Sequence, residues 1–506
     1  MPLYRSSPYF YSLLAAALPV LVVSTASLAD VWVFEPSAAI DQRFDDNYTI
    51  DQDNPDQTVA TRLVGTLGLS REAPSAVFAG LLRVDGLITN SNSRGGELNS
   101  NRVAFLSSQF TTARSEYGIG LNYKLDTPSR DISADITDLS VVAADTGANV
   151  TQDSNVARER WVISPNWRYN LTRLTTFEAD LSFTKVTHEL PSAEDALRTR
   201  WLAINPGLPV PDPITIEDTG FFTVDDELDD FNEAGIDIGI RSKLSPISTI
   251  SFFAGYSDFV AQVEPDVRAI IPFEDTIAAP DNKDIRRKQK RERRSNTATF
   301  RIGYDRAFTP TLNVGIQAGI YTNETDDTNL LRPTDSVGFD ENDQAYDEQG
   351  RPTVPATQEQ IDELVSESSG YLANITATKS TGVTKYSAKF GVDVLPSDTG
   401  SQVESLEAIV DIYRQLGPLL DFSFRVRAYE PDALKADADD EFSRRFLSLE
   451  PKLIWRFNRA WTVAGSYRYR RQKSQAAVSS GESNALLFSL KYTPPSAIRD
   501  AELGDG

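Results

Sequence analysis

Residues 156–188 read VARERWVISPNWRYNLTRLTTFEADLSFTKVTH and decide the fold that we expect for this chain. Apolar residues alternate with polar ones in its first arm, and they are Trp161, Ile163, Pro165, Trp167 and Tyr169. The other parity is polar and includes Arg160 and Arg168. Successive side chains of a β-strand point to opposite faces, so this arm has one apolar face and one charged face.

The second arm repeats the pattern after a tight turn at 171–174. Phe177, Ala179, Leu181 and Phe183 alternate there with Glu178, Asp180, Ser182 and Thr184. The whole stretch therefore predicts a β-hairpin with one apolar face. A single hairpin of this kind fits a soluble β-sandwich as well as a membrane barrel, so the rest of the chain has to decide between them.

Similar alternating segments continue along the chain and add up to about 18 strands. The connections alternate in length, because tight turns carrying Pro, Gly or Asn are followed by longer polar loops. Outer-membrane barrels have this layout, with an even strand number, short turns at one end and long loops at the other. We therefore expect an all-β, transmembrane, antiparallel up-and-down β-barrel over residues 30–493. Within it, Gly95 and Gly96 are expected in a loop that leads to a strand at Arg102–Thr112.

The composition excludes several classes of protein. The chain has no cysteine, so disulfides, thiolate metal sites and a cysteine nucleophile are ruled out. His188 is the single histidine, which leaves little for histidine-based catalysis or metal binding, and we expect neither enzyme activity nor a cofactor. The net charge of −23 argues against nucleic acid as a partner, since phosphate binding needs a basic surface.

The first 29 residues have the features of a cleaved secretory signal peptide. Arg5 is their only charged residue, Leu13–Val23 supplies the apolar core, and Ala29 stands at the expected cleavage site. The alternative is a single membrane anchor, which is disfavoured because the apolar stretch is short and broken by Pro19. Export without cysteine fits the envelope of a Gram-negative bacterium. Residues 494–506 would then form a C-terminal periplasmic tail.

Tyr and Trp recur near the ends of the expected strands, on the apolar parity. Such rings prefer the headgroup boundary and form girdles around outer-membrane barrels. We predict a place at the lipid interface for Trp161, Trp167, Tyr169, Tyr256, Tyr304, Trp455, Trp461, Tyr467 and Tyr492. Any one ring also fits ordinary core packing, so only the set favours a bilayer.

The opposite parity carries charge, which the core of a soluble protein would not tolerate. Since so many strands enclose more space than side chains fill, an aqueous lumen is expected. The candidates for lumen-facing residues are Arg160, Arg168, Glu178, Asp180, Arg241, Arg301, Asp421, Arg425, Arg427, Lys452, Arg456, Arg468 and Arg470. A basic wall suits anions or an anionic polymer, whereas rows that pair with each other would only keep the lumen wet. Glycines on this parity, such as Gly118 and Gly239, are expected to widen the lumen or to ease the curvature of the sheet.

Residues 286–294 read RRKQKRERR and form the sharpest charge feature of the chain. We expect this run in a loop at the outer end of a strand, where it could meet the phosphates of lipopolysaccharide. The alternative is a solvated loop, or one that folds against the acidic loops.

The segments WVFEPS at 32–37, DN at 46–47, DTG at 145–147, RERW at 158–161 and PNWRYNL at 165–171 carry a family resemblance. They resemble the beta-barrel porin type 2 proteins, which are outer-membrane barrels often encoded with exopolysaccharide or exosortase (PEP-CTERM) systems. In some members the resemblance implies a conduit for a secreted polysaccharide, working with a periplasmic polysaccharide export protein. Barrels of this sort often end in an aromatic residue, whereas here Phe488 and Tyr492 are followed by a tail.

Four functions are therefore open. The first is polysaccharide export, and the second is a general or anion-biased solute porin. The third is a structural barrel whose long acidic loops are the functional part. An outer-membrane enzyme is the fourth, and the single histidine disfavours it. The expected partners are outer-membrane lipids, lipopolysaccharide, the barrel assembly machinery and, for the first function, an export protein and its polysaccharide.

Overall fold

The computed structural model describes most of the expected barrel. The described residues are 32–47, 57–91, 95–126, 157–189, 230–263, 266–269, 285–288, 291–331, 338–339, 345–346, 352–353, 360–396, 402–433, 444–474 and 480–494. The expected signal peptide and nearly all of the expected tail lie outside them. Within these ranges no helix is long and apolar enough to cross a membrane.

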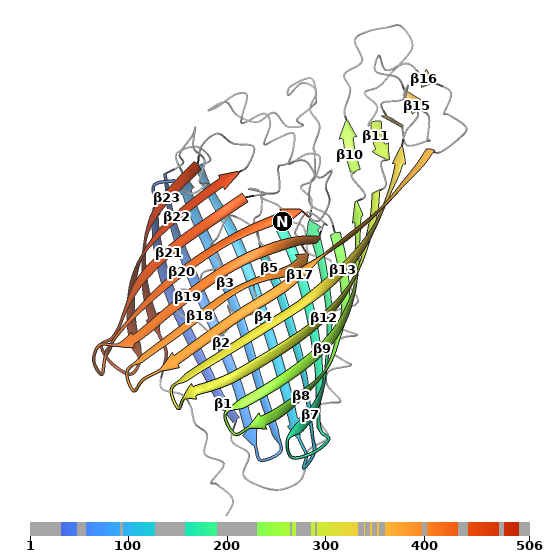
Figure 1. Ribbon diagram of the computed structural model, residues 1–506. Coiled ribbons are helices and arrows are strands. Elements are labelled where there is room, and N and C mark those ends of the chain that lie inside the picture. The colour runs from blue at the N-terminus through green and yellow to red at the C-terminus, as the bar shows by residue number, and fades with distance from the viewer. Residues whose placement is uncertain are drawn as a thin grey trace, which may run out of the picture.

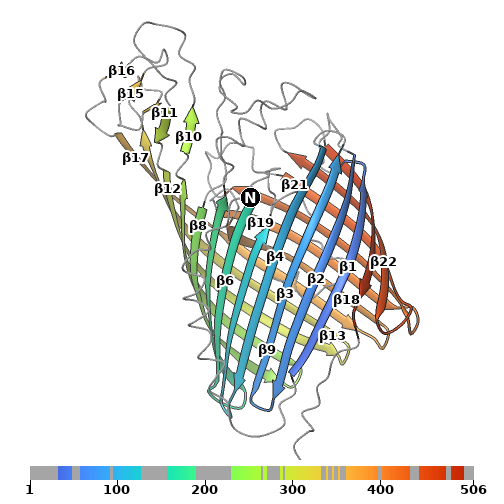
Figure 2. The same cartoon turned by 180° about the vertical axis from the view of Figure 1, so that it is seen from behind.

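Eighteen strands form one sheet. They are β1 (Trp32–Asp45), β2 (Thr58–Ala73), β3 (Ala76–Ser91), β4 (Gly95–Thr111), β5 (Ser115–Asp126), β6 (Ala157–Asn170), β7 (Thr175–Glu189), β8 (Asp230–Ser245), β9 (Ser248–Val263), β12 (Arg291–Thr309), β13 (Leu312–Leu331), β17 (Gln360–Ser380), β18 (Thr384–Pro396), β19 (Gln402–Gln415), β20 (Leu420–Ala433), β21 (Arg444–Arg456), β22 (Trp461–Ser474) and β23 (Ser480–Tyr492). Each pairs antiparallel with the next, and β1 pairs with β23, which closes the barrel (Figures 1 and 2). The predicted antiparallel barrel and its strand number are confirmed.

The closing seam between β1 and β23 is shorter than β1 itself. Its register runs from Ala38 opposite Tyr492 to Asp45 opposite Ala485, whereas β1 pairs with β2 from Trp32 onward. Continuing the register would place Pro36 opposite Pro494. Because proline has no backbone N–H to donate, the ladder cannot be extended past this point.

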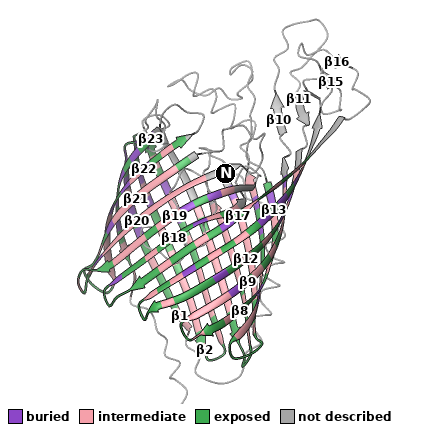
Figure 3. Ribbon diagram, in the orientation of Figure 1, coloured by how far each residue is buried: buried purple, intermediate pink, exposed green. Residues whose placement is uncertain are grey.

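The two faces of the barrel follow from the alternation of side chains along each strand. Exposed large apolar residues share one parity, as Phe300 and Ile302 do on β12 and Phe488 does on β23. The opposite parity holds buried polar side chains such as Ser295 and Ser483, and exposed residues alternate with intermediate or buried ones along many strands in Figure 3. An apolar outside and a polar inside invert the order of a soluble protein. Closed sheets with this inversion are suited to hydrocarbon, and the fold is a transmembrane β-barrel.

Short turns connect the strands at one end of the barrel, which we call the turn end, and the opposite end is the loop end. Side-chain oxygens accept backbone N–H groups in several turns: Thr112 from Ser115 (2.9 Å), Thr172 from Thr175 (3.0 Å), Thr381 from Thr384 (3.2 Å), and Asn458 from Ala460 and Trp461 (2.8 Å each). These residue types favour turns because their side chains replace a backbone partner locally.

One expected loop is a strand. β4 begins at Gly95 and pairs with β3 from Ser91 opposite Gly95, instead of beginning at Arg102. Residues 95–101, GGELNSN, lack an apolar alternation. The hydrophobic pattern alone does not reveal such a strand.

The basic run at 286–294 lies partly in strands, contrary to the expected loop. Its first residues belong to β11, and its last ones begin β12. The second sheet consists of β10 (Asp266–Ala269), β11 (Ile285–Lys288), β14 (Gly338–Phe339), β15 (Ala345–Tyr346) and β16 (Pro352–Thr353). It stands at the loop end, beyond the long strands β12, β13 and β17 (Figure 1). A contact between the run and lipopolysaccharide remains a prediction.

Candidate functional site on the inner wall

The inner wall carries two groups of charged side chains. The seam cluster lies on β21 to β23, β1 and β2, and comprises Asp41, Arg43, Asp45, Arg62, Glu450, Arg468, Arg470 and Ser483. The passage cluster lies on β5 to β8, β12 and β18 to β20, and comprises Glu116, Arg160, Arg168, Glu178, Asp180, Glu233, Asp237, Arg241, Arg301, Lys389, Asp393, Glu407, Asp411, Arg425 and Arg427. The two groups contain the same types of side chain and differ in exposure.

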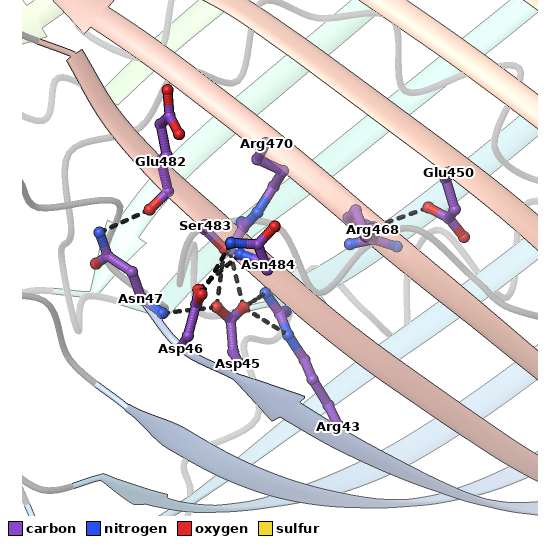
Figure 4. A network of polar contacts seen from close by, with 10 residues as sticks. All are labelled: Arg43, Asp45, Asp46, Asn47, Glu450, Arg468, Arg470, Glu482, Ser483 and Asn484. Carbon is purple, nitrogen blue, oxygen red and sulfur yellow. Dashed lines mark hydrogen bonds and ion pairs between the residues drawn. The ribbon is translucent and has the colours of Figure 1, made fainter.

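Asp45 is the centre of the seam cluster (Figure 4). Its carboxylate accepts hydrogen bonds from Arg43 Nε (3.1 Å), Arg470 Nη2 (3.0 Å) and Ser483 Oγ (2.8 Å). The side chains of Asp45 and Arg470 are both 0% exposed. Since these residues are 425 positions apart in the chain, their ion pair joins the two ends of the barrel across the seam.

Two further ion pairs flank this centre. Arg62 donates to Asp41 at 2.7 Å, and Arg468 donates to Glu450 at 2.8 Å. The side chain of Arg468 is only 2% exposed. Removing one partner of such a pair leaves a buried charge without compensation and costs about 3–5 kcal/mol. The seam cluster therefore stabilises closure.

The passage cluster consists of ion pairs whose cations keep contact with solvent, although the side chains of Glu178 and Glu407 are only 9% and 12% exposed. They are Arg168–Glu116 (2.9 Å), Arg241–Glu178 (3.5 Å), Arg301–Asp237, Lys389–Glu407 (2.8 Å), Arg425–Asp411 (2.6 Å) and Arg427–Glu407 (3.4 Å). The side chains of Arg168 and Arg241 are 49% and 48% exposed. Solvent-exposed pairs contribute about 0–1 kcal/mol each, so a passing charge can displace them at little cost.

Electrostatic interactions connect the distant strands of the passage cluster. Asp393 on β18 interacts with Arg301 on β12 and with Lys389 on its own strand. Asp180 on β7 interacts with Arg168, Asp237, Arg241 and Arg301 on three other strands. Arg301 therefore forms an ion pair with Asp237 of β8 and also acts electrostatically on Asp180 of β7 and Asp393 of β18.

All the lumen candidates chosen from the sequence lie on the inner parity, but they fall into different environments. Arg468 and Arg470 belong to the buried seam. Asp421, which is 0% exposed, forms an ion pair with Arg456 near the turn end, and Lys452 is buried on β21. The remaining candidates belong to the passage cluster, and their role in transport remains a prediction.

Comparison with known proteins shows that this chain resembles several solved structures in fold alone. No family model matches the chain, and no curated protein sequence matches it. Similar solved structures include Pseudomonas aeruginosa OccK5 (TM-score 0.36, 10% identity, 91% of this chain and 98% of that one) and P. aeruginosa OprD (0.34, 9%, 92% and 95%). The ferric-catecholate import receptor Fiu of E. coli K12 is another (0.41, 11%, 91% and 81%). The fold is that of an outer-membrane β-barrel, as its closure, inverted faces and alternating connections indicate by themselves.

Several members of the passage cluster were missed by the sequence candidates, namely Glu116, Glu233, Lys389, Asp393, Glu407 and Asp411. The signal was present in β19, where Glu407 and Asp411 fall on the parity opposite to the exposed Leu406 and Val410. Apolar Ile409 shares the inner parity, so the alternation of this barrel strand is blurred in the sequence. With these residues included, carboxylates are at least as numerous as cations in the cluster, and this part of the wall is mixed rather than basic.

At the two named inner-wall glycines the structure shows no open space that would widen the lumen, and their role in easing sheet curvature remains a prediction. A Cβ on Gly239 would lie 2.2 Å from Cδ1 of Phe253, and one on Gly118 would lie 2.5 Å from Oδ1 of Asn166. Side chains of neighbouring strands already occupy the space over these glycines. Aromatic packing over a glycine is a known device for holding strands in register.

The aromatic residues predicted at the lipid interface lie on the outer parity of the outer-membrane barrel. Tyr467 donates a hydrogen bond to Asn484 (2.5 Å) and Tyr256 donates one to Asn296 (3.1 Å). These asparagines stand where the outer face becomes polar toward the loop end. Nearer the turn end, Trp461 packs against Tyr492, as their ring centroids are 4.8 Å apart. Contact of the whole set with lipid headgroups remains a prediction.

His188 has a buried environment on β7. Its side chain is 1% exposed, and Nδ1 lies 3.5 Å from Oδ1 of Asp230. Among the residues that the structure describes, no group of three or more His, Cys, Asp or Glu is arranged to hold a metal ion. The absence of enzyme activity and of a cofactor remains a prediction.

Proposed function

We propose that this protein is an outer-membrane channel through which small, hydrated, charged solutes diffuse. The observation that supports this most is the passage cluster, whose ion pairs of both signs lie on the inner wall and remain partly exposed. A purely structural barrel would gain little from charges arranged in this way, because exposed pairs add little stability.

The wall acts on a solute through closely spaced opposite charges. Around Arg301, the carboxylates of Asp180, Asp237 and Asp393 interact with the same guanidinium. A charged or dipolar solute beside them can exchange part of its hydration shell for contacts of either sign. No single contact is strong, so the solute is oriented without being held, which conduction requires.

We expect weak preference for either sign of charge, because carboxylates at least match cations in the passage cluster. This favours a general solute porin over an anion-biased one.

Planar-bilayer recordings test the proposal. The purified protein should give stable conductance steps with a reversal potential close to zero in a KCl gradient. Replacing Arg301, Arg425 and Arg427 by Glu should make the channel cation-selective, since three cations on the inner wall change sign. Arg445→Glu, on the outer face, is the matched control and should leave selectivity unchanged. A correctly folded protein without conductance would overturn the proposal.

The proposal places the protein in the outer membrane of a Gram-negative bacterium, after export by its signal peptide and insertion by the barrel assembly machinery. Fractionation of the cell envelope should recover it with lipopolysaccharide. Recovery in the inner membrane or the soluble fraction would contradict this placement.

Export of a secreted polysaccharide is a finer form of the proposal. It is supported by the resemblance of segments such as 32–37 and 165–171 to beta-barrel porin type 2 proteins. It would add a periplasmic polysaccharide export protein as partner. Deleting the gene should then abolish surface polysaccharide while synthesis continues. Unchanged polysaccharide together with altered solute uptake would exclude export and leave the diffusion channel.

A further inference from the structure

The outer face of the turn end carries cations without carboxylates. Arg306 on β12, Lys379 on β17 and Arg414 on β19 are exposed and share the parity of the lipid-facing residues. Within the described strands, the acidic residues near this end all have the inner parity, and they are Glu35, Glu72, Glu116, Glu178, Asp305 and Asp421. The outer cations therefore face the membrane side without acidic neighbours on the same face of the described strands.

The loop end differs in this respect. Three of its outer-face cations form ion pairs with outer-face carboxylates, namely Arg294–Asp258 (3.0 Å), Arg445–Glu430 (2.6 Å) and Arg471–Glu482 (3.7 Å). The outer face of the described strands thus carries charges of both signs at the loop end and only cations at the turn end.

The turn-end cations form a row on every second strand of five that pair in sequence. Lys379 pairs with Leu312 of β13 on one side and with Tyr386 of β18 on the other, and β12 and β19 flank these strands. Two strand spacings and an offset of two residues along the strand separate successive cations, which amounts to about 12 Å. We call Arg306, Lys379 and Arg414 the basic row.

Aromatic rings accompany the basic row. The guanidinium of Arg306 lies 5.2 Å from the ring centroid of Phe308, and Tyr386, which is 42% exposed, lies on β18 between Lys379 and Arg414. Away from the row, on β2, Arg71 lies 5.3 Å from the ring centroid of Trp32. A long cationic side chain beside an aromatic ring is the usual arrangement at a membrane interface, where the stem stays in the apolar layer and the charge reaches the headgroups.

We propose that the basic row binds the phosphates of anionic phospholipids in the leaflet that surrounds the turn end. Lipid is favoured over an acidic protein because the row is continuous with the exposed apolar face of the same strands, including Ile302, Ile316 and Phe390. A soluble partner would have to cover surface that hydrocarbon already covers. The row would fix the depth and direction of the barrel in the membrane, whatever passes through it.

Native mass spectrometry of the detergent-solubilised protein tests this with phosphatidylglycerol and phosphatidylcholine of equal chain length. The unmodified chain should retain phosphatidylglycerol preferentially. In the triple variant R306Q/K379Q/R414Q this preference should fall by about tenfold or more, since each cation near a headgroup contributes separately. The matched control R294Q/R445Q/R471Q removes three loop-end cations and should keep the preference.

Three outcomes would overturn the proposal. They are equal retention of both lipids by the unmodified chain, an undiminished preference in the triple variant, and a loss confined to the loop-end control. A triple variant that keeps its lipid preference but loses binding to an acidic envelope protein would assign the row to protein instead. Heat-dependent gel migration verifies folding of each variant. Conductance in phosphatidylcholine bilayers should be unchanged in the triple variant, which separates this test from that of the channel.

Discussion

The seam cluster and the passage cluster use the same chemistry for different purposes. Both consist of cationic side chains paired with Asp or Glu on the inner wall, mostly between different strands. In the seam, Asp45 and Arg470 are 0% exposed, whereas Arg168 and Arg425 in the passage cluster are 49% and 34% exposed. Solvent access alone makes the first group a fastening between the chain ends and leaves the second available to solutes.

A charged residue that faces inward therefore does not necessarily take part in transport. A buried ion pair can be neutral or even unfavourable compared with an apolar replacement of both partners, but it is costly to break. An exposed pair contributes little to stability, yet its charges still act on ions in the lumen. Variants of the two clusters should therefore separate into stability effects and selectivity effects.

The largest effect is expected at the seam. Asp45→Ala would leave the guanidinium of Arg470 buried beside Ser483 without its carboxylate. The free energy of unfolding should fall by about 3–5 kcal/mol. Urea unfolding of the barrel in detergent measures this. Asp46→Ala, which removes a hydrogen-bond acceptor of Asn484 on the outer face, is the control and should cost about 1 kcal/mol or less. Equal losses in both variants would remove the distinction between the clusters.

A smaller loss of stability is expected from a substitution at Gly239, which lies on the inner wall. Gly239→Val would force its side chain against the ring of Phe253 and should cost about 1–3 kcal/mol by overpacking. The matched control is Gly86→Val, because a Cβ there meets nothing within 4 Å. If both substitutions were tolerated equally in thermal unfolding, the inner wall would not be packed laterally as the structure shows.

Removing carboxylates from the passage cluster should change selectivity more than stability. The triple variant with Asp180, Asp237 and Asp393 changed to Asn leaves Arg301 without these opposing charges. The anion permeability should rise several-fold over that of cations, while the free energy of unfolding changes by roughly 1 kcal/mol or less. Reversal potentials in a KCl gradient measure the first quantity. Asp258→Asn, on the outer face, should change neither the ratio of anion to cation permeability nor the free energy of unfolding.

The smallest effect concerns ionic strength. At 1 M salt the Debye length is about 3 Å, so the selectivity of the variant with Asp180, Asp237 and Asp393 changed to Asn should largely disappear. The buried seam is screened much less, and the unfolding midpoint of the unmodified chain should change little over the same range. A selectivity that persists at 1 M salt would mean that side chains bind the ions directly instead of acting through the field.

Much of the fold follows from local pattern. The alternation from Trp161 to Tyr169 specifies a strand with one apolar face, and turn residues such as Thr172 and Asn458 specify where strands reverse. The alternation fails to predict the start of β4 at Gly95, because the sequence there has no apolar alternation. The alternation also does not distinguish Arg425 from Arg470. Both face inward on their strands, yet Arg425 is partly exposed and Arg470 is buried.

What the sequence determined by itself was the set of strands, their parity and hence which residues face inward. Those properties depend on neighbours along the chain and on the two-residue period of a strand. Only the tertiary structure decided that Asp45 meets Arg470, that Asp237 meets Arg301, and that outer-face cations gather at the turn end. Closure brings residues hundreds of positions apart into contact and determines which charges lose water. Burial of a charge is a property of the assembled barrel, and no single strand contains it.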